Sequence, residues 1–395
     1  MRNLMLMVPM LHQGGFERVC IQTARLLEKY YNVTILIFSD KDINYDITGL
    51  NIVNIDVPAK KGKLNKVVNV LKRVTKTKQM KKELKIDITY SFGSSANLVN
   101  VLSNTGDKIL TGLRCSTDME APRQVSLFTK KSDLVLSCSK EIMRELKRDY
   151  NYERSRYIYN PLDVDGIQQR ADEAITDFPF EGEGLQIIAS VGRQDYIKGF
   201  WHLVKAFSIV ETSHPQARLM IMGTGNWDKY KKMVEEMGIA DKVAFTGVKK
   251  NPFPYVKRSD LYVLSSNHEG FPNAILEAMA LGKPCIAADC KTGPREILLS
   301  EDEYDQLVEA SPDGSSTAKA IDGEYGVIVP DMDQEEDFNP HHITFQEQDL
   351  ACEIIRMLDN KERMEHYGKK ALERARVYEP HKYGADLFKI LEEVR

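Results

Sequence analysis

The chain has 395 residues, of which 42% are apolar and 28% charged, which is the composition of a globular protein with about two domains. No apolar run approaches the roughly 18 residues of a membrane-spanning helix. The six scattered cysteines form no C-x-x-C pair, which argues against a structural zinc and favours reduced thiols in a cytoplasm. The net charge of -4 hides an asymmetry, because residues 1–160 carry 27 Lys/Arg against 16 Asp/Glu and residues 161–395 carry 27 against 42.

Apolar runs of strand length alternate with amphipathic stretches along almost the whole chain, a pattern typical of parallel sheets covered by helices. The predicted strands are 4–8, 33–38, 51–57, 87–91, 108–113, 134–138 and 156–159, and then 185–192, 217–223, 242–247, 261–266, 284–289 and 326–330. The fold class is therefore α/β, with two doubly wound Rossmann-like domains. We expect an N-terminal domain at 1–165, a C-terminal domain at 166–377 and a final helix within 378–395 that packs beyond the C-terminal domain.

The first strand leads into a double glycine, Gly14 and Gly15, ahead of the first helix. This turn is similar to one that cradles a phosphate, but it is not G-x-G-x-x-G, so a dehydrogenase is not favoured. An ordinary tight turn fits the same residues. The opening "MRNLMLMVPML" lacks a small-residue cleavage site, so we interpret it as a strand and not as a signal peptide.

A basic segment, Lys60–Lys85, holds eleven basic residues and one acid, with Lys72, Arg73, Lys81 and Lys82 among its cations. Its apolar residues recur at helical spacing: Leu64, Val67, Val68, Leu71 and Val74. Three interpretations are open: a solvated helix face, a site for an anionic lipid surface, or a site for nucleic acid. We expect membrane contact, because no nucleic-acid recognition motif accompanies the charge.

The stretch "SVGRQDYIKGFWHLVKAF" predicts a strand that ends at Gly192 and a helix that begins after Gly199. Arg193 and Lys198 are two positive charges in the connection between them. Two fixed cations at the carboxyl end of a strand can offset the charge of a departing diphosphate without a metal. Solvent-exposed surface charges are the alternative interpretation.

The stretch "NHEGFPNAILEAMALGKP" lies between two predicted strands and predicts a loop followed by a helix. We expect Asn273 to cap this helix and Gly282 to end it. A helix N-terminus at the carboxyl edge of a parallel sheet suits an anion, and Gly270 and Pro272 permit close approach. Glu269 and Glu277 can accept hydrogen bonds from sugar or ribose hydroxyls, although acids near a helix N-terminus also occur without any ligand.

Together these stretches resemble the retaining family-4 glycosyltransferases of the GT-B fold, in which two Rossmann-like domains face each other across a cleft. The resemblance covers nearly the whole chain, and the E-x7-E run from Glu269 to Glu277 is its most specific element. It implies catalytic roles for Glu269, Arg193 and Lys198, the latter two binding the diphosphate. It also implies donor contacts by Gly15, Val248, Gly270, Phe271, Pro272 and Asn273, with Glu277 on the ribose and Val248, in "FTGV", near the base.

Three further stretches bear on the resemblance. "TGPREIL", Thr292–Leu298, resembles bacterial members that build capsule, O-antigen or other lipid-linked glycans. "TGLRCSTD" places Arg114 in roughly the region where many members have a histidine, so Arg114 and Gly14 are candidates for contact with the acceptor or its phosphate. The acidic run "VIVPDMDQEEDFNPHH" is longer than its counterpart in the family, and we predict no role for it.

The resemblance implies a hexosyltransferase that retains configuration and needs no metal or cofactor. It would move a hexose or N-acetylhexosamine from a nucleotide diphosphate sugar to a glycan hydroxyl in bacterial surface polysaccharide synthesis. We expect a UDP-sugar ahead of GDP-mannose, and an acceptor linked to polyprenyl diphosphate. The aspartates Asp163 and Asp165 are the one metal-like pair, but they fall in the interdomain connection. No nucleic acid is expected as a partner.

The expected location is the cytoplasm, peripheral on the inner face of the membrane through the basic segment. Two other functions stay open at this point: a nucleotide-sugar epimerase of the same fold, and a non-catalytic subunit that binds a nucleotide sugar. No motif distinguishes among the possible sugars, since these differ by one hydroxyl orientation or an acetamide.

Overall fold

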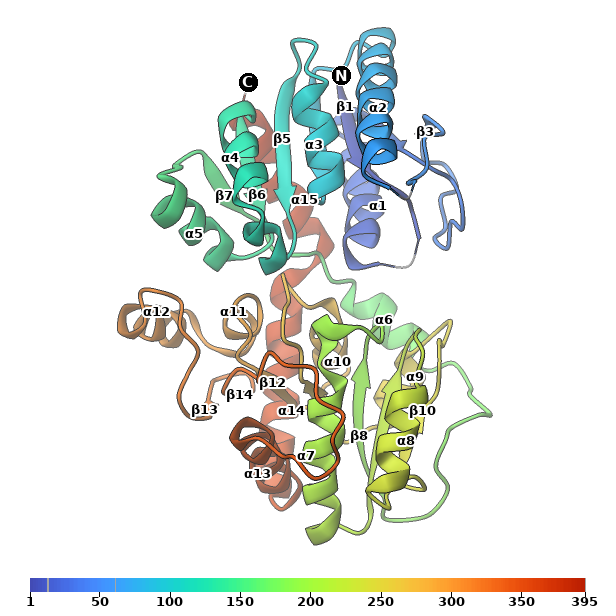
Figure 1. The fold of residues 1–395 in the computed structure, drawn as a ribbon, viewed down its shortest axis with the longest axis vertical. Coiled ribbons are helices and arrows are strands. Elements are labelled where there is room, and N and C mark those ends of the chain that lie inside the picture. Colours follow the sequence, from blue (N-terminus) through green and yellow to red (C-terminus); the bar gives the residue numbers. More distant parts are fainter. Residues whose placement is uncertain (13, 61, 395) are drawn as a thin grey trace. The chain divides into compact units, whose positions relative to one another are not determined.

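The computed structural model describes residues 1–12, 14–60 and 62–394; the side chains of Lys63 and Leu64 also lie outside the described part. The chain forms two compact units (Figure 1). Unit 1 is Met1–Pro161 with Pro380–Arg395, and unit 2 is Leu162–Glu379. The predicted boundaries, after residues 165 and 377, fall a few residues from these.

Unit 1 is a doubly wound α/β sheet whose strands run parallel, in the order β3-β2-β1-β4-β5-β6-β7. Its strands are β1 (Arg2–Val8), β2 (Tyr31–Ile37), β3 (Ile52–Asn54), β4 (Ile88–Phe92), β5 (Lys108–Leu113), β6 (Leu134–Ser137) and β7 (Ser155–Tyr157). Its helices are α1 (Gly15–Leu27), α2 (Lys63–Glu83), α3 (Ser94–Leu102), η1 (Ser116–Glu120), α4 (Pro122–Lys131), α5 (Lys140–Tyr150) and α15 (Pro380–Glu393). Each of the seven strands predicted for this half is present.

The sheet of unit 1 is apolar on both faces because its central strand alternates between two cores. Leu4 and Leu6 face the core that contains α1 and α15, whereas Met5 and Met7 face the core that contains α2 and α3. The last helix, α15, is part of the first of these cores through Leu387.

Unit 2 has the same architecture, with strand order β10-β9-β8-β11-β12-β14-β13. Its strands are β8 (Gln186–Val191), β9 (Ala217–Met222), β10 (Val243–Phe245), β11 (Leu261–Leu264), β12 (Cys285–Ala288), β13 (Ile321–Asp322) and β14 (Val327–Val329). Its helices are α6 (Val164–Arg170), η2 (Tyr196–Lys198), α7 (Phe200–Ser213), α8 (Asp228–Glu236), α9 (Phe253–Lys257), α10 (Asn273–Ala280), α11 (Pro294–Leu298), α12 (Glu301–Ala310), α13 (Phe345–Leu358), α14 (Lys361–Ala375) and η3 (Arg376–Tyr378). The sequence missed β13, a two-residue strand that pairs antiparallel with β14 at the sheet edge.

An aspartate directly before a strand recurs at the amino edges of both sheets. Asp87 accepts a hydrogen bond from Asn3 N at 2.7 Å, and Asp260 accepts one from Ile187 N, also at 2.7 Å. In each case the backbone N–H of the aspartate donates back to the same neighbour, at 2.9 and 2.8 Å. These contacts join β4 to β1 and β11 to β8, the pairs at which each sheet reverses its direction of winding. They hold in register the strands whose carboxyl ends carry the candidate site.

Helix α2 contains most of the basic segment, and its side chains divide between the core and the solvent. Val74 packs into the core, whereas Val67, Val68 and Leu71 are 61%, 48% and 62% exposed. Leu64, the other residue of the predicted apolar stripe, has its side chain outside the described part. Among the residues that the structure describes, no helix has the length and apolar character that crossing a bilayer requires.

Two of the cations expected to meet a membrane are instead structural. Lys81 is 1% exposed and donates to Asp107 at 2.8 Å and to Asn100 at 2.9 Å. Burial lowers the pKa of Lys81 to about 8, although Asp107 acts in the opposite direction. Arg73 donates to the carbonyl of Val57 at 2.9 Å. The expectation that Lys81 faces the membrane is wrong, whereas Arg73 is half-buried and keeps part of its side chain at the surface.

Lys81→Met should destabilise unit 1 by about 3 kcal/mol, because it leaves the buried Asp107 carboxylate without its cation. Lys82→Met is the matched control, since Lys82 follows directly in the same helix and is exposed; it should change the unfolding free energy by less than about 0.5 kcal/mol. Urea unfolding of both variants measures the difference. Equal values for the two would contradict a stabilising role for the Lys81–Asp107 pair.

Candidate active site

The site lies at the carboxyl edge of the unit 2 sheet, between its two central strands. From β8 the chain winds outward through β9 and β10, whereas from β11 it winds in the other direction through β12 and β14. The loops after β8 and β11 therefore leave neighbouring strands at the point where the sheet reverses its winding, which is where α/β sheets commonly bind ligands. Lys198 follows β8 and Glu269 follows β11, so the topology brings together two residues that are 71 positions apart.

Lys198 and Glu269 form an ion pair at this edge. Nζ of Lys198 lies 2.6 Å from Oε1 of Glu269, and their side chains are 21% and 9% exposed. Burial opposes the charge on Lys198, but the attraction and hydrogen bond of Glu269 outweigh it, so the pKa of Lys198 is raised. Ser266 donates to the same carboxylate oxygen at 2.7 Å, and Thr292 donates to the Glu269 carbonyl. Both side chains are thus fixed in place.

The backbone around Lys198 is held by the segment that precedes Glu269. Asn267 donates from its backbone to Ile197 O at 2.8 Å and from its side chain to Tyr196 O at 3.0 Å. Gly199 has a φ of 55° and packs so closely on the Ser265 carbonyl that a Cβ would overlap it. A glycine is therefore required at this turn, for both its conformation and its size.

Arg193 does not join the Lys198–Glu269 pair in this structure. Its side chain is 67% exposed and donates from Nε to Oδ2 of Asp195 at 2.8 Å. The expected pairing of Arg193 with Lys198 on a diphosphate would require the guanidinium to leave Asp195.

Helix α10 supplies the other predicted donor contacts, with one correction. Its N-cap is Pro272 in an extended conformation, and Asn273 is the first helical residue, so the prediction that Asn273 caps the helix is wrong. Proline provides no side-chain acceptor for the first-turn N–H groups. Gly270 and Phe271 are buried ahead of the helix. Gly293, with a φ of 96°, packs so closely on Pro272 that a Cβ would not fit.

The remaining predicted residues of unit 2 also lie toward the carboxyl edge. Glu277, one turn into α10, is 9% exposed, and its charge helps to raise the pKa of Tyr262, for which burial is the larger cause. Val248 follows β10 and is 48% exposed. The metal-like pair has other contacts: Asp163 caps α6 by accepting from Gly166 N at 3.0 Å, and Asp165 lies 3.5 Å from Arg376.

In unit 1, Gly14 and Gly15 follow β1 as predicted. The N–H of Gly14 donates to the Tyr45 hydroxyl at 2.9 Å, and the same hydroxyl donates to the Gly14 carbonyl at 2.6 Å. A Cβ on Gly14 would overlap the carboxylate of Glu17. These atoms are the end of a flexible side chain, and the φ of Gly14 is -167°, so neither packing nor conformation demands glycine at this position.

Arg114 follows β5 and its guanidinium is largely enclosed. It donates from Nη2 to Asn160 and lies 5.7 Å from the Phe92 ring. Burial acts to lower the pKa of Arg114, but Tyr90 and other ionisable side chains around it raise this pKa overall. The buried Nη1 has no hydrogen-bond partner among the described residues.

The sequence did not identify Ser266 and Thr292, which fix Glu269, or Asn267, which holds the backbone beside Lys198. Ser266 stands three positions before Glu269, which is a possible signal, but the contact of Thr292 depends on the tertiary fold. Within the described ranges, no cluster of three or more His, Cys, Asp or Glu side chains has an arrangement suited to a metal ion.

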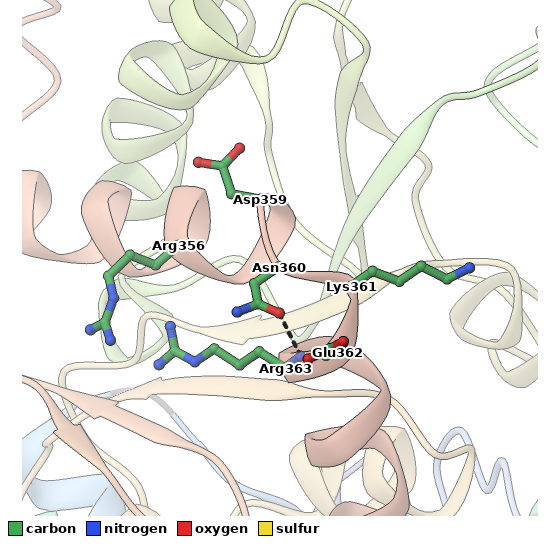
Figure 2. Close-up of a pocket in the computed structure, with 6 residues that line it drawn as sticks. All are labelled: Arg356, Asp359, Asn360, Lys361, Glu362 and Arg363. Atoms are coloured by element: carbon green, nitrogen blue, oxygen red, sulfur yellow. Dashed lines mark hydrogen bonds between the residues drawn. The ribbon is translucent and has the colours of Figure 1, made fainter.

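A separate surface pocket lies where α13 ends and α14 begins (Figure 2). Gln186, at the start of β8, donates to Leu358 O at 3.4 Å, which places this pocket toward the amino edge of the sheet. Asn360 caps α14 by accepting from Arg363 N at 2.9 Å, the dashed line in Figure 2. Arg356 and Arg363 pair with carboxylates of unit 2. The pocket is therefore remote from Lys198 and Glu269.

Two doubly wound α/β units in one chain, with a pair of opposite charges at the carboxyl edge of the second, are typical of the GT-B fold class. The structure of Anabaena HepE in complex with UDP and glucose is similar over 100% of both chains, with a TM-score of 0.72 and 16% identity. At this identity the likeness concerns the fold. The fold class predicted from the sequence is confirmed.

Residues 172–323 match the family described as Glycosyl transferases group 1, and they include Lys198, Glu269 and Glu277. Unit 2 thus carries a group 1 glycosyl transferase domain of the family-4 type, as the resemblance predicted. An uncharacterized glycosyltransferase of Methanocaldococcus jannaschii is 28% identical over 67% of this chain and 63% of its own length. The N-acetylgalactosamine-N,N'-diacetylbacillosaminyl-diphospho-undecaprenol 4-alpha-N-acetylgalactosaminyltransferase of Campylobacter jejuni is 27% identical over 80% of this chain and 88% of its own length.

Asp331, after β14, provides a test of the electrostatics at this edge. Burial raises the pKa of Asp331 to about 7; the Met332 N–H and Arg295 act against this, and the Asp289 carboxylate adds to it. The folded protein thus binds this proton more tightly than the unfolded chain, where the pKa is near 3.8. Below about pH 4, Asp331 is protonated in both states and does not reduce the free energy of unfolding. Between about pH 4 and pH 7 it reduces this free energy by an increasing amount, and above about pH 7 the reduction is constant.

Asp331→Asn should therefore raise the melting temperature at pH 8 and leave it nearly unchanged at pH 4. Asp349→Asn is the control, because Asp349 lines the same surface hollow as Asp331 and is exposed. Differential scanning fluorimetry across this pH range measures both. A gain for Asp331→Asn that did not grow with pH would contradict the raised pKa.

Proposed function

We propose that the protein is a retaining glycosyltransferase that uses a nucleotide diphosphate sugar, preferably a UDP-sugar, and a glycan acceptor carried on a polyprenyl diphosphate lipid. The observation that carries the proposal is the Lys198–Glu269 pair at the reversal point of the unit 2 sheet. The group 1 domain supports glycosyl transfer. UDP and glucose in HepE support the donor class, and the diphospho-undecaprenol in the name of the Campylobacter relative supports the acceptor class.

The ion pair explains how one site accommodates a donor with both a diphosphate and a sugar. Without ligand, each charge compensates the other across 2.6 Å. A bound diphosphate takes the Lys198 ammonium, and sugar hydroxyls then donate to the Glu269 carboxylate, so both charges keep a partner. Partner exchange thus avoids leaving either charge buried and alone.

Helix α10 adds positive potential for the diphosphate. Its first-turn N–H groups point out of the helix N-terminus, and Pro272 gives them no side-chain acceptor. Arg193 provides a second cation once its guanidinium moves from Asp195 to a phosphate oxygen. Lys198, Arg193 and these peptide dipoles together offset the charge that develops on the leaving group, so that no metal is needed.

The chemical step is an attack by an acceptor hydroxyl on the anomeric carbon from the face that the diphosphate leaves. The bond from this carbon to the diphosphate oxygen breaks, and a bond to the acceptor oxygen forms. The acceptor proton passes to the departing diphosphate oxygen, so configuration is retained without a protein nucleophile. Glu269 orients the sugar, Glu277 binds the ribose and Val248 contacts the base.

We assign acceptor binding to unit 1, where the enclosed Arg114 guanidinium suits a phosphate of the lipid carrier. Helix α2 then provides the membrane contact, since Val67, Val68 and Leu71 form an exposed apolar patch. Exposed lysines of the same helix stand around it: Lys66, Lys72, Lys78 and Lys82. Apolar side chains surrounded by cations match the interface of an anionic bilayer.

Glu269→Ala should lower kcat for transfer by about 100-fold, because it removes the group that orients the sugar in the transition state. Glu235→Ala, on the exposed side of α8, is the control and should retain full activity. Release of UDP from a panel of UDP-sugars with a lipid-linked acceptor measures turnover, with and without EDTA. Wild-type-like turnover of Glu269→Ala would refute the assignment, and loss of turnover in EDTA would refute the metal-free mechanism.

The same assay with donor alone separates transfer from epimerisation. An epimerase converts the sugar while it stays attached to the nucleotide, whereas a transferase needs the acceptor. A changed nucleotide sugar without acceptor would contradict the proposed function.

The double variant Val67→Gln, Leu71→Gln should reduce partition onto vesicles containing anionic phosphatidylglycerol by about tenfold, because it removes the apolar part of the patch. Phe345→Gln is the control, since Phe345 is 82% exposed and lies in unit 2. Vesicle flotation measures partition, and neutral vesicles should bind all variants weakly. Equal flotation of the double variant and the wild type would exclude α2 as the membrane contact.

A further inference from the structure

The acidic segment, defined as Asp331–His342, joins β14 to α13 and contains neither helix nor strand. Its course is nevertheless fixed by packing. Met332 is 3% exposed within the unit 2 core. The Phe338 ring lies 4.9 Å from that of Tyr230 at 90° and 6.2 Å from that of Trp201. The segment is thus bound to α7 and α8 along its length.

A buried lysine on α7 and an exposed lysine on α8 pair with two carboxylates of the segment. Lys205, whose side chain is fully buried, lies 2.9 Å from Asp337, and His342 lies 2.7 Å from the same oxygen. Burial acts to raise the pKa of Asp337, but the hydrogen bonds of Lys205, Asn339 N and His342 lower it to about 2. Lys229 lies 3.6 Å from Glu336. Asp337 and Glu336 therefore pair with cations of the protein itself.

A second anchor connects the middle of the segment to α7 and α13. Nε2 of His202 lies 3.0 Å from the Asp333 carbonyl, and Nδ1 lies 2.8 Å from Glu347. His202 and Glu347 are both buried, and Glu347 also caps α13 by accepting from Thr344 N at 2.8 Å. The position of Asp333 is thus coupled to the start of two helices.

Between these anchors the acidic segment reaches the turn that carries Lys198. The Tyr196 hydroxyl donates to the Gln334 carbonyl at 2.7 Å. Tyr196 opens η2, Lys198 closes it, and the Tyr196 ring lies 5.9 Å from both the Trp201 and the His268 rings. The turn is therefore held from the β11 side by Asn267 and from the other side by Gln334.

We propose that the acidic segment sets the position of Lys198 through Tyr196, which makes Tyr196 a positioning residue for binding of the donor diphosphate. The predicted effect of Tyr196 on turnover rests on the proposed function. The predicted effect of Tyr196 on the position of Lys198 does not. A single hydroxyl transmits the contact, because the Tyr196 ring packs on other residues. Removal of that hydroxyl frees η2 on one side and leaves the unit 2 core intact.

Tyr196→Phe should lower kcat/KM for the donor and the affinity for UDP by about tenfold, with a melting temperature close to that of the wild type. Tyr31→Phe is the control: it also loses a phenol hydroxyl that donates a hydrogen bond, in this case to the Glu392 carboxylate at 2.8 Å in unit 1. A positioning role also predicts that the substitution has little further effect in a Lys198→Met background. Equal losses in both backgrounds, or a change below twofold in the first, would overturn the proposal.

Chemical labelling of the Lys198 amine tests the same contact and does not require an enzymatic assay. Trinitrobenzenesulfonate should modify Lys198 several-fold faster in Tyr196→Phe than in the wild type, because the ammonium leaves Glu269 more often; Tyr31→Phe should match the wild type. Mass spectrometry of the peptide that contains residue 198 measures the rate. An unchanged rate would refute the positioning role. If the wild type neither bound UDP nor transferred sugar, while Lys198 was still labelled faster in Tyr196→Phe than in the wild type, only the proposed function would be refuted.

Discussion

The ion pair between Lys198 and Glu269 is the interaction on which the candidate site depends. Both side chains are mostly removed from water, which is costly for charged groups unless they remain paired. The rest of the site serves to keep the two charges at hydrogen-bonding distance: Gly199 permits the turn, Asn267 ties the two loops together, and Ser266 holds the carboxylate. A pair built in this way suits a function in which a ligand exchanges with both partners, because the protein has already removed most of the water from the two charges.

The position of that pair follows from sheet topology and not from proximity in the chain. Parallel strands direct all their outgoing loops to one edge, and the reversal of winding between β8 and β11 makes these two strands neighbours, so that their loops meet at that edge. The aspartates that precede β4 and β11 fix the register of the corresponding strand pair in each unit. The same edge in unit 1 carries Gly14 and Arg114, so the two units repeat one architecture with different side chains at the functional end.

Much of the architecture could be predicted because it depends on apolar periodicity. Buried parallel strands have continuous apolar runs, and each predicted run became a strand, whereas β13 has two residues and no such run. Lys198 and Glu269 could be placed at one edge for the same reason. What failed depended on local competition between groups. Asn273 is a good cap in isolation, but Pro272 already occupies the cap position, and the pairing of Arg193 with Asp195 is a choice of rotamer that no sequence pattern specifies.

Counts of charge along the sequence were the least reliable guide, and the structure explains why. In α2, Lys81 and Arg73 are used within unit 1, so the surface offered to a membrane is smaller and more apolar than the basic segment suggested. In the acidic segment, for which the sequence predicted no role, Asp337 and Glu336 pair with lysines of α7 and α8, and the Gln334 carbonyl contacts Tyr196 in the turn that holds Lys198. A charged run therefore indicates function only through the charges that remain after the fold has paired the others. In the basic segment, the charges that remain are the lysines beside Val67 and Leu71. In the acidic segment, the group that contacts the turn of Lys198 is a backbone carbonyl, that of Gln334.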